Sequence, residues 1–275
     1  MKTQNFTPHI FFVCFLFVLG NAVLALPINE FNPFIFVLLS GLLSLTLVAT
    51  SFLMSCATEN KFLFFALCFI ALITSVFGAI STFLDYYRFL TQTQMPYTNS
   101  VLIILILVIT GVILSSFRLS AVLKYCLFTG IISITIITLC FIAGIKNYDF
   151  SSFKLIQTEK IFSFKVFIYC FSPTLVLPFL FHNTIKDFSF KSMFVGTLAG
   201  FITLLITCLQ TVLTLGLAGI DFSYLKTVST ISTGSLFSRL DGLVFFVCFA
   251  SSIIKIIFCC KAALFSFKNI FLQTK

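Results

Sequence analysis

Long uninterrupted runs of apolar residues are the feature that most restricts how this chain can fold. Eight such runs alternate with short polar segments, at residues 8–26, 33–56, 62–83, 99–117, 121–145, 165–181, 192–219 and 237–258, with an extension of the last run to residue 265 left open. An α-helix of about 20 apolar residues crosses the hydrocarbon core of a bilayer. The sequence therefore predicts an all-α integral membrane protein with about eight transmembrane helices.

The composition excludes a soluble protein and argues against a nucleic-acid binder. Of the 275 residues, 60% are hydrophobic and only 9% are charged, which is too few polar residues to cover a soluble core. The net charge of +9 is dispersed between the apolar runs, without the basic stripe of a nucleic-acid-binding surface. No linker separates a soluble domain, so residues 1–275 are interpreted as a single polytopic transmembrane domain in contact with the lipid bilayer.

The distribution of Lys and Arg predicts the orientation in the membrane. With the N-terminus inside, more of these residues fall in the cytoplasmic segments, and most of the outer ones lie in the single long loop that starts at Lys146. Short loops carry most of the orienting signal, and their positive charge marks the cytoplasmic side. Both termini are therefore predicted to be cytoplasmic.

Motifs for catalysis, metal binding or cofactor binding are absent from the sequence. There is no phosphate-binding loop, dinucleotide fingerprint or metalloprotease motif. Nearly all of the ten cysteines fall inside apolar runs, where they are interpreted as small hydrophobic residues. The acidic residues Glu30, Glu59, Asp85 and Asp187 are expected at helix ends, in reach of water. We therefore expect no enzyme, no cofactor and no metal site.

Two of the apolar runs are interrupted. The first contains Gly20 and Asn21, and the sixth contains Ser172, Pro173 and Thr174. A proline within a helix removes one backbone hydrogen bond, so the sixth run predicts either a kinked helix or a discontinuous one. Because five helices separate the two interruptions, they correspond in position, as in transporters whose substrate site lies between the broken first helices of two inverted repeats. These five residues are the candidate ligand-binding residues.

The same correspondence divides the chain. Residues 1–145 form the predicted first repeat, residues 146–164 an outer loop, and residues 165–275 an incomplete second repeat. In the seventh run, Gly196 and Gly200 form a GxxxG match that permits close helix contact. Gln210 and the threonines at 203, 207, 211 and 214 form a polar stripe expected to face protein.

The eighth run carries the charges Arg239, Asp241 and Lys255. Asp241 and Lys255 are fourteen residues apart, which places them on almost one stripe of a helix. Lys255 has two interpretations. It either reaches the cytoplasmic surface from near the helix end, or it marks, with Asp241, the inward face of the helix beside the two interrupted helices.

Three segments carry a resemblance to a known family. The segments "TPHIFFVCFLFVLGNAVLALP", "FLTQTQMPYTNSVLIILILVITGVI" and, most specifically, "GSLFSRLDGLVFFVCFASSIIKIIF" resemble the B subunit of bacterial spore germinant receptors. That family belongs to the amino acid–polyamine–organocation superfamily, which implies a LeuT-type five-plus-five inverted repeat, here lacking the last two helices. The resemblance implies a subunit that senses a small, amino acid-like germinant beside A-type and C-type receptor subunits, in the spore inner membrane or a bacterial cell membrane.

Two departures from the family keep alternatives open. The chain lacks the ninth and tenth helices, which puts transport in doubt, and between Lys165 and Asp187 it has no acidic residue where relatives often carry one. The alternatives are an amino acid permease-type secondary transporter and a truncated paralogue without transport activity.

Overall fold

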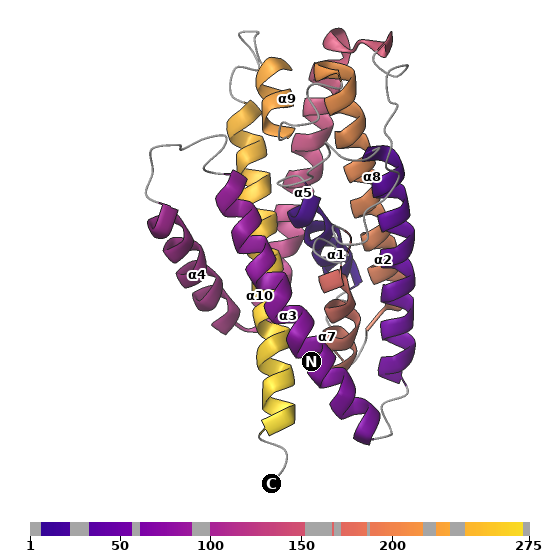
Figure 1. Ribbon diagram of the computed structural model, residues 1–275, viewed down its shortest axis with the longest axis vertical. Helices are drawn as coiled ribbons and strands as arrows, with labels where there is room; N and C mark the ends of the chain where they lie inside the picture. The colour runs from indigo at the N-terminus through magenta and orange to yellow at the C-terminus, as the bar shows by residue number, and fades with distance from the viewer. Residues whose placement is uncertain are drawn as a thin grey trace.

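In the computed structural model, the chain is described at residues 7–22, 33–56, 61–89, 100–151, 167, 172–185, 188–216, 224–231 and 240–271. All regular structure within these ranges is helical (Figure 1). The α-helices are α1 (Thr7–Ala22), α2 (Pro33–Cys56), α3 (Lys61–Phe89), α4 (Ser100–Ser116), α5 (Leu119–Gly144), α7 (Val176–Thr184), α8 (Phe190–Leu215), α9 (Tyr224–Ile231) and α10 (Leu240–Phe271). Two short 3₁₀ helices, η3 (Ile145–Asn147) and η5 (Ser172–Leu175), accompany them.

Helix length separates two groups among the described elements. Five helices, α2, α3, α5, α8 and α10, are long and apolar enough to cross a membrane. The helices α1, α4 and α7 have 16, 17 and 9 residues, fewer than the roughly 20 that a bilayer requires. The predicted class, an all-α integral membrane protein, is confirmed, whereas eight spanning helices and the inverted repeat stay predictions.

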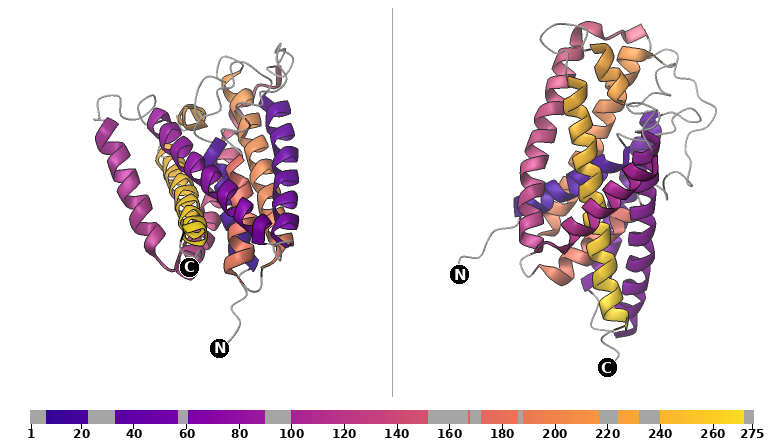
Figure 2. Two further views of the ribbon diagram at one scale, coloured as in Figure 1. Left: turned by 60° about the horizontal axis from the view of Figure 1, so that its bottom comes forward. Right: turned by 90° about the vertical axis from the view of Figure 1, so that its left-hand side faces the viewer.

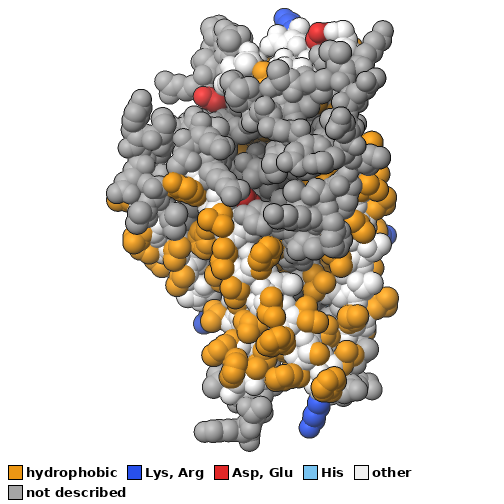
Figure 3. Space-filling view, in the orientation of Figure 1, with side chains coloured by type: hydrophobic (Ala, Val, Ile, Leu, Met, Phe, Trp, Pro, Cys, Tyr) orange, Lys and Arg blue, Asp and Glu red, His pale blue; other side chains and the backbone are white. Residues whose placement is uncertain are grey.

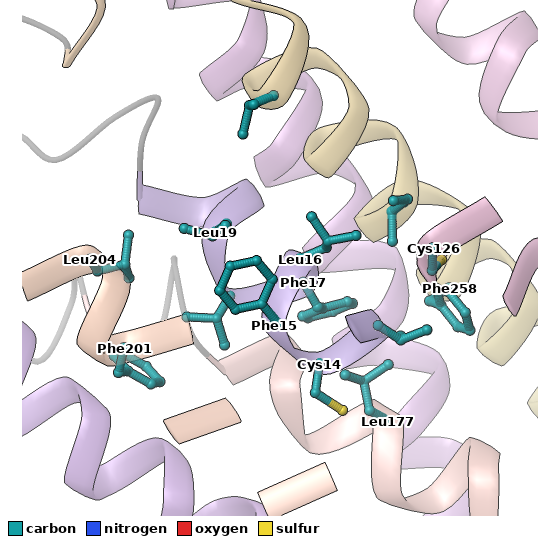
Figure 4. Packing of buried hydrophobic residues seen from close by; sticks show 14 of the residues in the cluster. Cys14, Phe15, Leu16, Phe17, Leu19, Cys126, Leu177, Phe201, Leu204 and Phe258 are labelled. Atoms are coloured by element: carbon teal, nitrogen blue, oxygen red, sulfur yellow. The ribbon is translucent and has the colours of Figure 1, made fainter. Parts of the chain in front are cut away.

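The centre of the bundle is α1. Its side chains from Val13 to Leu19 are at most 1% exposed, as expected of a helix that is apolar on all sides. It crosses the bundle obliquely (Figure 2) and packs against α5, α8 and α10. Figure 4 shows its side chains meeting Phe201 and Leu204 of α8, Cys126 of α5 and Leu177 of α7.

The GxxxG match brings α8 against α1. A Cβ atom at Gly200 would lie 2.8 Å from Val18 Cβ and 3.2 Å from the Phe15 carbonyl oxygen, and one at Gly196 would collide with the Phe11 carbonyl. Only glycine allows backbones to approach this closely. The predicted close contact is therefore confirmed, and its partner is α1.

The polar stripe of α8 also faces protein, as predicted. Thr207, Gln210 and Thr211 are buried, and the threonine hydroxyls donate to carbonyls of their own helix. Gln210 Nε2 donates to the Cys140 carbonyl of α5, and the Tyr224 hydroxyl of α9 donates to Gln210 Oε1 at 2.6 Å. Gln210 thus joins three helices.

In the sixth apolar run, the predicted interruption coincides with η5, a 3₁₀ turn that leads into α7. Pro178 has no N–H group with which to bond a carbonyl of the preceding turn. The Ser51 hydroxyl of α2 donates to the Leu175 carbonyl at 2.9 Å, which satisfies a backbone acceptor inside the bundle. Pro173 therefore lies in a 3₁₀ turn that is supported from α2, and because residues 168–171 lie outside the described ranges, a discontinuous sixth helix stays a prediction.

The first apolar run differs from its prediction. The backbone of α1 is α-helical through Gly20 and Asn21 as far as Ala22, so no interruption is observed at these two residues. Residues 23–32, which include the end of that run, lie outside the described ranges.

The cysteines and α4 complete the fold. Seven cysteines are buried in the core and behave as the small hydrophobic residues expected.

Helix α4 lies at the edge of the bundle (Figures 1 and 2). The Ser115 carbonyl in its last turn and the Phe117 carbonyl just after its end accept hydrogen bonds from Lys261 Nζ of α10, at 2.8 and 2.7 Å, a favourable place for a cation at a helix C-terminus.

Candidate functional site: a buried charged seam between α3 and α10

Lys255 lies at the middle of α10. The helix runs to Phe271, so Lys255 is fifteen residues from its first residue and sixteen from its last. Its side chain is 1% exposed, and its Nζ lies 5.9 Å from the centre of the Phe17 ring of α1. Of the two interpretations left open by the sequence, the one in which Lys255 reaches the surface is wrong, because its side chain lies inside the bundle.

Asp85 is a second buried charge that the sequence prediction missed. It was expected at a helix end in reach of water, but α3 continues to Phe89 and the Asp85 side chain is 2% exposed. A charged side chain at this depth in a membrane protein usually faces the protein interior and has a functional role.

The packing of α3 against α10 places Asp85 and Lys255 in one seam. A Cβ atom at Gly78 would lie 3.1 Å from Cys259 Sγ, and the rings of Tyr86 and Phe249 are 5.7 Å apart. Residue numbers therefore rise along α3 as they fall along α10, so the two helices are antiparallel. Asp85 lies between these two contacts on α3.

Helical spacing then aligns the polar residues of the seam. Asp85 lies seven residues after Gly78, and Ser252 lies seven residues before Cys259. Seven residues make two turns, so Asp85 shares a face of α3 with Gly78, and Ser252 shares a face of α10 with Cys259. Asp85 and Ser252 therefore lie at the same level. Lys255, four residues before Cys259, lies one turn away on the same face of α10.

Ser252 adds an unsatisfied group to the seam. Its side chain is fully buried, and its Oγ has no hydrogen-bond partner. The neighbouring Ser251 instead donates to the Cys248 carbonyl of its own helix at 3.1 Å. A buried hydroxyl without a partner costs free energy, and within the described ranges Asp85 Oδ1 in the same seam is also buried without a hydrogen-bond partner.

Helices α1 and η5 close the seam. A Cβ atom at Gly20 would lie 2.8 Å from the Ser251 carbonyl oxygen, and one at Gly78 would lie 2.8 Å from Pro173. Thr174, which follows Pro173, is 1% exposed. Gly20 and Pro173 thus lie beside α10 at two levels, near Ser251 and near Cys259, with Lys255 between these levels. Thr174, Asn21 and Ser172 are next to them in the chain.

Asp241 is not part of this cluster. It lies in the first turn of α10 with a half-buried side chain that accepts from the Gly242 amide at 2.8 Å. Fourteen residues separate it from Lys255, which corresponds to about 21 Å along the helix. The structure therefore places Lys255 inside the bundle, whereas a shared role of Asp241 and Lys255 stays a prediction. Arg239 lies outside the described residues.

A spacing signal for Asp85 was present in the sequence. Small and polar residues recur every three or four positions along α3, at Ser75, Gly78, Ser81, Thr82 and Asp85, and all five are buried. In an otherwise apolar helix, such a stripe indicates the face that packs against protein. Asp85 continues this stripe, which assigns it to the interior.

The fold and the seam together define an all-α integral membrane protein with opposite charges buried among closely packed helices. In the described ranges, no group of three His, Cys, Asp or Glu side chains could hold a metal ion. Comparisons with protein-family models, with curated proteins and with solved structures gave no match.

Proposed function

We propose that this chain is a membrane subunit that binds a small molecule in the seam formed by α1, α3, η5 and α10, and that it acts as the B-type subunit of a spore germinant receptor. The observation that carries the proposal is the burial of Asp85 and Lys255, at 2% and 1% exposure, in the middle of an apolar bundle. Charges are expensive in such a place and are typical of ligand and ion sites.

The receptor assignment rests on the resemblance of the segment Gly234 to Phe258, to which Lys255 belongs. In that assignment the chain completes its function with A-type and C-type subunits in the spore inner membrane. The eight-span architecture with an incomplete five-plus-five repeat belongs to the same proposal. Binding and signalling, rather than catalysis, are the activities proposed.

Germination of spores tests this function. Replacing Lys255 by Met should abolish or strongly delay the response to the germinant, because the substitution removes a buried charge of the seam. The matched control is Lys268→Met, at an exposed position of the same helix, which should leave germination unchanged. Equal responses of the two variants, or normal germination without the gene, would contradict the proposal.

A secondary transporter for amino acids is the second candidate. Buried charges beside a broken helix also occur at the substrate sites of such transporters. Uptake of a radiolabelled amino acid into proteoliposomes that contain the purified chain would favour transport. Binding without uptake would favour the receptor subunit.

A further inference from the structure

The corner where α4 ends and α5 begins gathers positive charge. Arg118 is the N-cap residue of α5, and its side chain is exposed. Lys124, in the second turn of the same helix, is also exposed. Lys261 of α10 donates to the carbonyl of Phe117, the residue before Arg118. Three basic residues, from α5 and α10, therefore stand at one corner of the bundle.

The acids that the structure describes lie away from this corner. Asp149 follows η3 at the far end of α5, and Asp241 is in the first turn of α10, about 30 Å along that helix from Lys261. Asp85 is buried at the level of Ser252, which is about 14 Å along α10 from Lys261. These three carboxylates therefore do not neutralise the corner.

Beyond Lys124, an exposed apolar stripe runs along α5. Phe128 and Ile131 are 64% and 50% exposed, and their spacing of four and three residues from Lys124 onward places all three on one face. Thr135 and Thr138 continue this face, and their hydroxyls donate to carbonyls of their own helix at 3.0 and 2.8 Å. The stripe therefore suits the acyl chains of lipids, as expected on a helix long and apolar enough to cross a membrane.

The two exposed cations of α5 are close enough to share one anion. Six residues separate Arg118 from Lys124, about 9 Å along the helix, which is less than the combined reach of an arginine and a lysine side chain. A guanidinium group binds phosphate through two parallel hydrogen bonds, and an ammonium group adds a point charge. Near the end of a membrane helix, a lysine extends its charge toward the lipid headgroups while its methylene groups stay among apolar side chains.

We propose that this corner binds an anionic phospholipid. The lipid phosphate lies between Arg118 and Lys124, and one acyl chain lies along Phe128 and Ile131. Lys261 holds the corner in place through its two bonds to the carbonyls at the end of α4. A soluble phosphate would match the cations but not the apolar stripe, and charge complementarity selects an anionic over a zwitterionic headgroup. This site is independent of the seam and of any germinant, because it needs only the lipid-facing surface of α5.

Fluorescence quenching by brominated lipids tests the site. The chain contains no tryptophan, so Phe128→Trp introduces a single fluorophore one turn from Lys124. The purified chain is reconstituted in phosphatidylcholine vesicles that contain the same minor fraction of one brominated lipid, either phosphatidylglycerol or phosphatidylcholine. Because bromine quenches a neighbouring tryptophan, we expect stronger quenching by brominated phosphatidylglycerol, with a local preference of about fivefold for each of the two basic residues. Equal quenching by the two lipids would overturn the proposal.

Charge variants in the same background identify the residues that bind the headgroup. Arg118→Gln and Lys124→Gln should each lower the preference for phosphatidylglycerol by about fivefold, and the double variant should abolish it. Lys146→Gln removes an exposed charge just beyond the opposite end of α5 and should leave the preference unchanged. A preference that survives in the double variant would reflect the net charge of the protein and would also overturn the proposal.

Two further reporters keep the measurement decisive. Ile131→Trp, on the same stripe, replaces Phe128→Trp if that variant does not fold. Phe246→Trp, at an exposed position of α10 five residues from Asp241, should show no preference for phosphatidylglycerol. If neither brominated lipid quenches the reporters on α5 while both quench Phe246→Trp, this face of α5 is covered by protein and the proposal fails.

Discussion

Gly78 is the residue at which α3, η5 and α10 meet, so its size controls the seam. An added Cβ would lie 2.8 Å from Cβ and Cγ of Pro173 and 3.1 Å from Cys259 Sγ. We predict that Gly78→Ala destabilises the protein by about 1–3 kcal/mol, the usual cost of overpacking a tight interior. Unfolding in detergent or nanodiscs measures the change. At Gly242, an added Cβ meets nothing within 4 Å, so Gly242→Ala should be neutral or stabilising by up to about 1 kcal/mol. Equal losses at both positions would contradict the packing of the seam.

At the level of single residues, the sequence predicted only part of the site. Lys255 was identified, and so were Gly20, Pro173 and Thr174, because charges, prolines and glycines stand out in apolar runs. Asp85 was missed for a physical reason. A charge lowers the local hydropathy, so the end of a run is placed at the charge, and only tertiary packing decides whether that charge lies at a surface or in the interior.

At the scale of elements, the hydrogen bond from Ser51 to the Leu175 carbonyl supports the break before α7. We predict that Ser51→Ala costs about 1–3 kcal/mol, because it leaves a buried carbonyl without its partner. Thr50 is the matched control, since its exposed hydroxyl bonds only to the Leu47 carbonyl of its own helix. Thr50→Ala should change the unfolding midpoint little, and a loss as large as that of Ser51→Ala would exclude a supporting role for Ser51.

A second prediction at this scale concerns Lys261. Its ammonium group bonds the last carbonyls of α4, so Lys261→Met should loosen the end of that helix. Hydrogen–deuterium exchange should become faster at the last turn of α4 and stay unchanged in α8. Lys268→Met, on the same helix but exposed, should leave both unchanged. Because Lys261 has this contact, it is unsuitable as a neutral control for Lys255.

Element boundaries account for most differences between prediction and structure. The apolar runs located every described α-helix except α9, which is short and polar enough to escape a hydropathy criterion. Their ends were less accurate, since α3 continues past residue 83 to Phe89 and α10 continues past residue 265 to Phe271. Helix α1 stays regular through Gly20, and Ser251 packs against that glycine, a contact between residues far apart in the sequence.

At the scale of the whole molecule, five of the six basic side chains that are exposed among the described residues lie at one end of the bundle, and Lys146 lies at the other. The lower end in Figure 1 contains the first turns of α3 and α8 and the last turns of α10. Exposed basic side chains at the starts of α3, α5 and α8 and at the end of α10 belong to Lys61, Arg118, Lys124, Lys191 and Lys268. Figure 3 shows hydrophobic side chains over the lower half of the face in view, with a Lys or Arg side chain at its bottom end. Because positive loops stay cytoplasmic, this end is predicted to face the cytoplasm.

Cysteine labelling tests that orientation. Cys56 is the exposed cysteine among the described ones, so a Cys56→Ser parent provides the background. Lys146→Cys, in η3 at the opposite end, should react with a membrane-impermeant maleimide in intact cells, whereas Lys268→Cys should react only after the membrane is opened. Both positions are exposed and both side chains are replaced by the same thiol, so a difference in labelling reports the side of the membrane rather than burial. The reverse pattern would place the basic end outside, and with it the C-terminal end of α10. Labelling of both positions in intact cells would contradict a fixed transmembrane orientation of the bundle.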